Sequence, residues 1–167
     1  TAANAQPAAN TVGITTLGNT GGDVKVYAIA GNLTVNQAVS TVPAATTGQV
    51  GGTVVLEASG NITSVAAGTV TTTGGTSATT AGNGGEIFIY SNTSGTITLG
   101  GNVTSNGGAR TTTSGNGGVV TVRAVSGDIL IQATISTSGG TSGTVGNGGT
   151  VQLTAAGTGN ITENGSG

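Results

Sequence analysis

Five stretches of this 167-residue chain alternate between apolar and other side chains, and each begins at a Gly-Gly pair. Alternation with a period of two is typical of a strand with one face turned inward. The stretches are GGDVKVYA (21–28), GGTVVLEA (51–58), GGEIFIYS (84–91), GGVVTVRA (117–124) and GGTVQLTA (148–155). Their apolar positions form two columns that we expect to point inward, namely Val24, Val54, Ile87, Val120 and Val151, and Val26, Leu56, Ile89, Val122 and Leu153.

The opposite positions of the same stretches carry most of their charged and aromatic side chains. One column reads Lys25, Val55, Phe88, Thr121 and Gln152, and the next reads Tyr27, Glu57, Tyr90, Arg123 and Thr154. Charged side chains are rarely buried without a partner. The separation therefore supports one inward and one outward face.

One shorter segment with the same alternation follows each stretch, and a second follows each of the first four. The first of them has an inward column of Leu33, Ile62, Ile97, Ile129 and Ile161. The second has an inward column of Val39, Val70, Val103 and Ile135. The chain then passes through a loop rich in Ser, Thr, Gly and Ala. It reaches the next Gly-Gly pair at intervals of 30, 33, 33 and 31 residues.

These repeats predict the fold. One unit has three short strands and cannot bury its apolar face alone, whereas stacked units turn each column into a continuous ladder. The sequence therefore predicts an all-β fold over residues 11–167, preceded by an extension at 1–10. That fold is a single parallel β-helix (β-solenoid) of about five coils with three strands per coil. Disorder and an antiparallel sandwich are the alternatives, but neither explains aligned apolar columns at this spacing.

The tetrapeptide Gly-Asn-Gly-Gly at 82–85, 115–118 and 146–149 marks the corner that returns the chain to the first strand. Glycine permits positive φ and close backbone approach, and Asn tolerates positive φ better than most residues. We expect both properties to be used at this corner. The predicted corner glycines are Gly21, Gly22, Gly51, Gly52, Gly84, Gly85, Gly117, Gly118, Gly148 and Gly149.

The composition of the chain excludes several classes of function. The chain has 34 glycines, 5% charged residues, a net charge of −2 and no Cys, His, Met or Trp. Three basic residues are too few to neutralise a nucleic-acid backbone, so nucleic acid is not an expected partner. Zero cysteine excludes disulfides and thiolate metal sites. No apolar run is long enough to insert into a membrane as a helix.

The repeat phrase also resembles a known family. The pattern G-N-I-T, then V-T-T-x-G-G, a loop, and G-N-G-G-x-V-x-L-x-A is similar to repeat regions of filamentous-haemagglutinin-like bacterial surface exoproteins. These are two-partner-secreted or autotransporter-type parallel β-helices, and the resemblance covers roughly residues 11–163. It implies a right-handed solenoid, secretion to the extracellular space or cell surface, and a role in adhesins, fibres or coats.

Candidate chemistry is sparse. The five acids are Asp23, Glu57, Glu86, Asp128 and Glu163, of which Asp23 and Glu86 share one column two coils apart. Unrelated surface acids explain this pair better than the two carboxylates of a glycosidase do. We therefore expect no enzyme, no metal site and no cofactor, with a carbohydrate-active enzyme as the third-ranked function. Tyr90 and Arg123 share an outer column, which indicates either a local surface pair or a patch for a partner or glycan.

The two ends of the sequence suggest assembly. The last unit has two strands, and residues 10–22 resemble a third strand and its loop, with Thr11 and Val12 in the place of Thr69 and Val70. We expect head-to-tail homopolymers, in which one copy's first strand completes the last coil of its neighbour. The predicted interface comprises Thr11, Val12, Ile14, Leu17, Ile161 and Glu163. The alternative is a repeat segment of a large secreted adhesin that binds glycans of a host or neighbouring cell.

Overall fold

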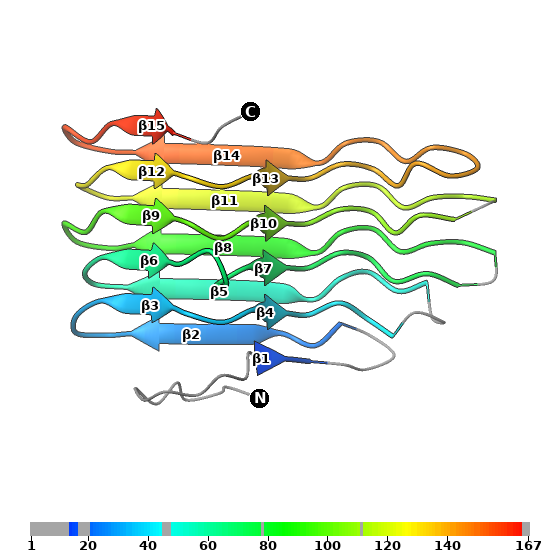
Figure 1. The fold of residues 1–167 in the computed structure, drawn as a ribbon, viewed down its shortest axis with the longest axis horizontal. Coiled ribbons are helices and arrows are strands. Elements are labelled where there is room, and N and C mark those ends of the chain that lie inside the picture. Colours follow the sequence, from blue (N-terminus) through cyan, green and yellow to red (C-terminus); the bar gives the residue numbers. More distant parts are fainter. Residues whose placement is uncertain (1–13, 17–20, 45–47, 78, 111, 165–167) are drawn as a thin grey trace.

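The computed structural model describes residues 14–16, 21–44, 48–77, 79–110 and 112–164. It contains fifteen strands in three parallel sheets of five strands each, and the described residues form no helix. Successive strands belong to successive sheets, so every three strands complete one coil (Figure 1). The chain is therefore a parallel β-solenoid with four complete coils, β2 to β13, preceded by β1 and followed by β14 and β15.

The first sheet contains the longest strands and confirms both predicted columns. Its strands are β2 (Val24–Ala28), β5 (Thr53–Ala58), β8 (Glu86–Ser91), β11 (Val119–Ala124) and β14 (Thr150–Ala155). Residues of one predicted column pair rung by rung, as in Val54 with Ile87 and Val120 with Val151. The Gly-Gly anchors in the sequence therefore give the true register of this sheet.

The second and third sheets close the coil with shorter strands. The second sheet comprises β3 (Leu33–Val35), β6 (Ile62–Ser64), β9 (Ile97–Leu99), β12 (Ile129–Ile131) and β15 (Ile161–Glu163). The third comprises β1 (Ile14–Thr15), β4 (Val39–Ser40), β7 (Val70–Thr71), β10 (Val103–Thr104) and β13 (Ile135–Ser136). Their inward columns also match the sequence, because Leu33 pairs with Ile62 and Val39 pairs with Val70.

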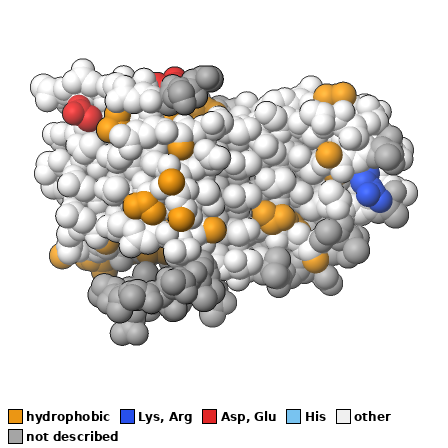
Figure 2. Space-filling model, viewed as in Figure 1, with side chains coloured by type: hydrophobic (Ala, Val, Ile, Leu, Met, Phe, Trp, Pro, Cys, Tyr) orange, Lys and Arg blue, Asp and Glu red, His pale blue; other side chains and the backbone are white. Residues whose placement is uncertain are grey.

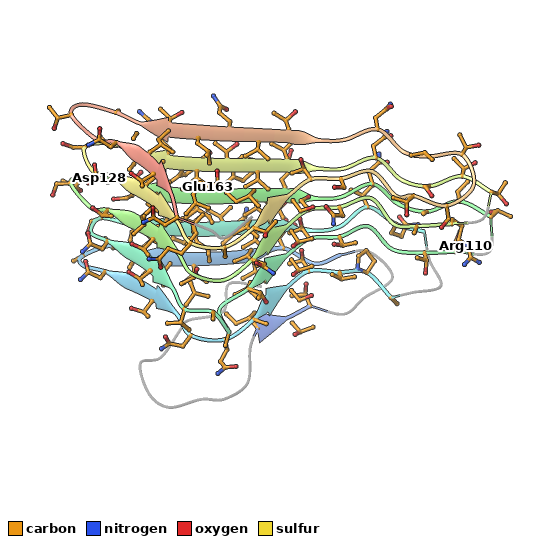
Figure 3. All side chains as sticks on the ribbon, turned by 45° about the horizontal axis from the view of Figure 1, so that its top comes forward. Arg110, Asp128 and Glu163 are labelled. Carbon is orange, nitrogen blue, oxygen red and sulfur yellow. The ribbon has the colours of Figure 1, made fainter. Side chains whose placement is uncertain are left out.

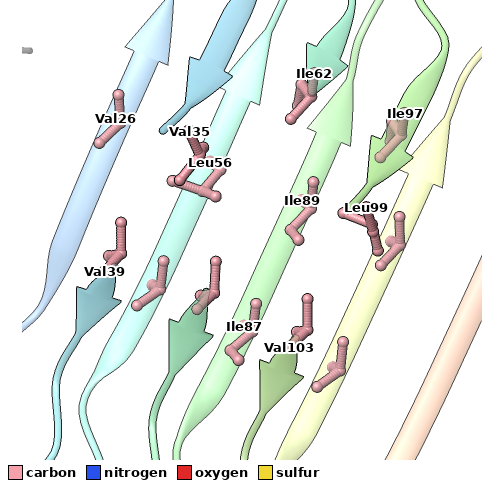
Figure 4. Packing of buried hydrophobic residues seen from close by; sticks show 14 of the residues in the cluster. Val26, Val35, Val39, Leu56, Ile62, Ile87, Ile89, Ile97, Leu99 and Val103 are labelled. Carbon is pink, nitrogen blue, oxygen red and sulfur yellow. The ribbon is translucent and has the colours of Figure 1, made fainter. Parts of the chain in front are cut away.

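One aliphatic core runs through the stack between the three sheets. Figure 4 shows Val, Ile and Leu side chains from all three sheets meeting in the interior. Ile87, Ile97 and Ile129 have no exposed surface. Burying one such side chain is worth about 1.5–3 kcal/mol. Small β-branched side chains thus form the core without the aromatic and Met residues that the sequence lacks.

The long loops extend beyond the sheets as two adjacent arms in each coil (Figure 1). Backbone hydrogen bonds join the arms within a coil, from the Gly82 amide to the Gly75 carbonyl oxygen and from Gly115 to Gly108, both at 2.8–2.9 Å. At the far end, Thr80, Thr113 and Thr144 pair in parallel from coil to coil. The loops therefore continue the stacking of the sheets by backbone contacts.

The structure contradicts the expected positive φ at the corner glycines and supports the expected close backbone approach. None of the predicted corner glycines among the described residues has positive φ, which occurs instead at Gly31, Gly48, Gly143 and Gly157. Close backbone approach is confirmed, since a Cβ on Gly118 would lie 2.0 Å from the carbonyl oxygen of Gly85. The corner backbone is packed directly on the previous coil. Except at Gly148, which has open space, glycine is required at this corner by lack of space, and not by a left-handed turn.

The N-terminal register also differs from the prediction. Ile14 of β1 pairs with Val39, so Ile14 occupies the position that the sequence comparison assigned to Val12. Thr11 and Val12 lie outside the described residues. The error is a shift of two residues, which keeps the same side chains on the inward face. Alternation alone cannot detect such a shift.

Candidate functional site

The outer face of the first sheet concentrates the chemistry of this chain. It carries Asp23, Lys25, Glu57, Glu86 and Arg123 together with all three aromatic residues, Tyr27, Phe88 and Tyr90. The face shown in Figure 2 is by contrast almost entirely uncharged. Figure 3 places Asp128 and Glu163 toward one edge of the coil and Arg110 at the opposite tip of the loops.

Tyr90 is the centre of this outer surface. Its ring packs against Phe88 with centroids 5.9 Å apart and an angle of 42° between the rings. Glu57 and Arg123 flank Tyr90 on the adjacent rungs, as the shared column predicted. Burial raises the pKa of Tyr90; the positive charge of Arg123 acts in the opposite direction, while Glu57 and Glu86 add to the increase. Tyr90 therefore has Phe88 as its ring contact and Arg123 as a neighbouring charge.

One of the two acids that share a column in the first sheet, Asp23, makes a structural hydrogen bond. Asp23 and Glu86 share one column with Thr53 between them, as predicted. The carboxylate Oδ1 of Asp23 accepts a hydrogen bond from the Thr53 amide at 3.0 Å. Among the described residues, no group of three or more His, Cys, Asp or Glu side chains could hold a metal ion. The expectation that this chain is not an enzyme stays a prediction.

A ladder of Asn side chains joins the coils at the corner. Oδ1 of Asn83 accepts the backbone amide of Asn116, and Oδ1 of Asn116 accepts the amide of Asn147, both at 2.8 Å. In each case the oxygen belongs to one coil and the amide to the next coil toward the C-terminus. The side chain therefore pairs a backbone donor with an acceptor, as a strand ladder would.

The same arrangement recurs at the other corners and was missed by the sequence reasoning. Oδ1 of Asn32 accepts the Asn61 amide at 2.8 Å, and Oδ1 of Asp128 accepts the Asn160 amide at 2.7 Å. Oδ1 of Asn102 likewise accepts the Thr134 amide of the next coil at 3.1 Å. The corner Asn residues thus have a hydrogen-bonding role in addition to their place in the turn. The recurrence of Asn or Asp directly before β3, β6, β10, β12 and β15 was the signal.

The end of the stack formed by β14 and β15 exposes apolar side chains of the core columns. Val151 is 42% exposed and Ile161 is 48% exposed, whereas their partners Val120 and Ile129 on the adjacent coil are fully buried. Leu153 of β14 is half-buried. We call this surface, defined by Val151, Leu153 and Ile161, the β14–β15 end face. Exposed apolar strand edges of this kind are templates for further pairing.

Three of the predicted interface residues are described, and they lie at the two ends of the solenoid. Ile161 and Glu163 belong to β15 at one end of the second sheet, and Ile14 belongs to β1 at the other end of the third sheet. Thr11, Val12 and Leu17 lie outside the described residues. The structure thus separates Ile14 from Ile161 within one chain. They can meet only between two copies.

Comparisons with known proteins leave the fold as the guide to function. No protein-family model, curated protein or solved structure matches this chain. Within the described part of the chain, no helix is long and apolar enough to cross a membrane. The class defined by the geometry is therefore the parallel β-solenoid.

Proposed function

We propose that this chain is a structural subunit of an extracellular fibre or surface filament that assembles head to tail. The observation that carries the proposal is the arrangement of the terminal strands. One end offers β14 and β15 in the first and second sheets, and the other offers β1 in the third. A second copy stacked on the β14–β15 end face would place its β1 beside β13, so that the shared coil has all three strands.

The energetics favour such stacking. A next coil would cover Val151 and Ile161, whose counterparts one coil earlier are fully buried. Burial of apolar surface contributes about 25 cal/mol per Å². The edge backbone of β14 would gain a parallel partner in the register that β11 and β14 already use. A heterologous contact of this kind does not close, and it therefore generates a filament.

The sequence pattern supports a structural role outside the cell. The repeat resembles those of filamentous-haemagglutinin-like exoproteins, which are secreted, and the chain has 5% charged residues with which to bind charged partners. The partner is then another copy of the same chain, with no nucleic acid, membrane insertion, cofactor or catalysis involved.

Electron microscopy of the purified chain over a range of concentrations tests the proposal. We expect uniform filaments one solenoid wide, appearing above a threshold concentration. Deletion of residues 1–17, which removes β1, should abolish them, as should a charge on the end face in the double variant Val151→Lys and Ile161→Lys. The control is Thr121→Lys on the outer face of β11, which should still polymerise. Rods of one fixed length at every concentration would exclude the filament.

A repeat segment of a large adhesin is the second candidate, and the outer face of the first sheet favours it. Tyr27 is 52% exposed, and Glu57 and Arg123 lie beside Tyr90 on the same face. Aromatic rings with flanking charged groups can contact the apolar faces and hydroxyls of sugars. In that case Tyr27→Ala and Tyr90→Ala would reduce binding to immobilised cell-surface glycans and leave the solenoid folded.

A further inference from the structure

Three copies of the sequence Gly-Asn-Gly-Gly have different surroundings in the stack. At 82–85, Asn83 Oδ1 accepts the Asn116 amide, and the amide of Gly84 donates to the Asn116 carbonyl oxygen at 2.8 Å. At 115–118, Asn116 Oδ1 accepts the Asn147 amide, and the amide of Gly117 donates to the Asn147 carbonyl oxygen, both at 2.8 Å. At 146–149, neither the Asn147 side chain nor the Gly148 amide has a hydrogen-bond partner among the described residues.

Space around the glycine differs in the same way. A Cβ on Gly117 would lie 1.8 Å from the carbonyl oxygen of Thr137, and one on Gly84 would lie 2.3 Å from that of Ser105. A Cβ on Gly148 would meet nothing nearer than the Thr137 oxygen at 3.9 Å. Both Asn147 and Gly148 are exposed. The Gly148 amide thus has open space and no hydrogen bond, although the Asn147 carbonyl oxygen and the Gly149 amide beside it are bonded to Gly117 and Thr137. The Gly84 and Gly117 amides are both hydrogen-bonded and closely packed.

This contrast controls one reaction of the Asn-Gly sequence. The backbone nitrogen of the glycine attacks Cγ of the preceding Asn, forms a five-membered succinimide and expels the side-chain nitrogen as ammonia. Water then opens the ring at either carbonyl, which gives aspartate or isoaspartate. The attack needs a glycine nitrogen that is not donating a hydrogen bond and a backbone that can turn to bring it onto Cγ. A glycine is the least hindered nucleophile because it has no side chain.

We propose that Asn147, in the last corner of the stack formed by residues 1–167, is a site of spontaneous deamidation whenever no further coil covers it, and that Asn83 and Asn116 are protected by the coil stacked above them. Asn106, also followed by glycine, belongs with the protected group. Its Oδ1 accepts the Ser138 amide at 2.8 Å, and the Gly107 amide donates to the Ser138 carbonyl oxygen at 2.9 Å.

The two products differ in their effect on the ladder. Aspartate keeps the accepting oxygen, as Asp23 and Asp128 do at equivalent corners. Isoaspartate adds a methylene to the main chain directly before Gly148. That extra atom shifts the Gly-Gly pair and β14 out of the register that pairs Val120 with Val151. Isoaspartate at residue 147 therefore weakens the β14–β15 end face as a surface for stacking.

The test is incubation of the intact, dilute chain at mildly alkaline pH, followed by proteolysis and fragmentation mass spectrometry. The two hydrogen bonds absent at Asn147 correspond to deamidation at least about tenfold faster than at Asn116, Asn106 or Asn83. Gly148→Ala, which the open space accommodates, should slow the reaction at Asn147 and leave the other sites unchanged. Equal rates at Asn147 and Asn116, or no effect of Gly148→Ala, would overturn the proposal.

The experiment also separates this inference from the proposed filament. The comparison at low concentration depends only on the single chain. If filaments form, a second copy covers Asn147, and its deamidation should fall to the rate of Asn116 in the filament fraction. Fast deamidation without any filament would leave this inference standing and refute the proposed assembly.

Discussion

The corner before β11 and the corner before β14 have the same sequence, Gly-Asn-Gly-Gly, and lead into strands that pair residue by residue. Their physical situations are nevertheless different. The corner at 115–118 lies between two coils, and Val120 behind it is fully buried. The corner at 146–149 has a coil on one side, and Val151 behind it is 42% exposed.

This difference teaches that the contribution of a residue is set by the coil next to it as much as by its own identity. Each coil of a solenoid contacts only its neighbours, so stability is close to a sum of coil terms and interface terms. Residues 115–124 belong to two interfaces and residues 146–155 to one. Identical substitutions at matched positions should therefore have unequal effects, which can be measured.

The largest contrast is expected for alanine in place of the corner glycines. In Gly117→Ala the new Cβ would lie 1.8 Å from the Thr137 carbonyl oxygen, so the backbone must move. We expect a loss of about 3 kcal/mol in the free energy of unfolding, at the upper end of overpacking effects. The matched variant Gly148→Ala has open space and should change stability by less than about 0.5 kcal/mol. Urea denaturation of both variants checks this, and equal losses would contradict it.

The second contrast concerns the aliphatic core. Val120→Ala removes two fully buried methyl groups, which should cost about 2 kcal/mol in transfer and cavity terms. Val151→Ala, on the next rung of the same column, should cost less than about 1 kcal/mol because its side chain is 42% exposed. The midpoints of thermal unfolding give the comparison. If Val151→Ala were as damaging as Val120→Ala, then Val151 would be buried in solution, and a stacked copy would be the first explanation to examine.

The smallest contrast concerns the Asn ladder. Asn116→Ala removes the acceptor of the Asn147 amide and should cost about 1 kcal/mol, the usual net value of one hydrogen bond. Asn116→Asp retains an accepting oxygen and should be close to neutral, as the Asp128 contact with Asn160 illustrates. Asn147→Ala should also be nearly neutral. Amide hydrogen exchange at residue 147 reads the effect directly, since only Asn116→Ala should accelerate it.

The sheets could be predicted from the sequence because burial repeats there. Ile87, Val120 and Val151 are aligned by a fixed distance from Gly-Gly, and the pairing of β8, β11 and β14 follows the same alignment. A one-residue slip would have moved the apolar side chains outward, so the alternation fixes the register of each strand modulo two residues. The charged outer column of Glu57, Tyr90 and Arg123 could be predicted for the same reason.

The features that the sequence did not predict depend on how one coil is placed on the next. The shift from Val12 to Ile14 preserves the inward face, so no pattern opposes it. The role of the corner glycines was misjudged because positive φ and lack of space both select glycine, and only coordinates distinguish them. The Asn ladder needs the direction of hydrogen bonds between coils, which no single repeat contains.

The hydrogen bonds between coils have a mechanical consequence. They run along the stacking axis: the Val119 amide donates to the Gly85 carbonyl oxygen, and the Thr150 amide donates to the Gly118 carbonyl oxygen. A pull along that axis acts on all interfaces in series, and coils detach one at a time from an end, where a coil has one neighbour. Each detached coil of 30 to 33 residues releases on the order of 100 Å of extended chain. Under tension such a rod would lengthen in equal steps, and the size of the step would report the length of the repeat.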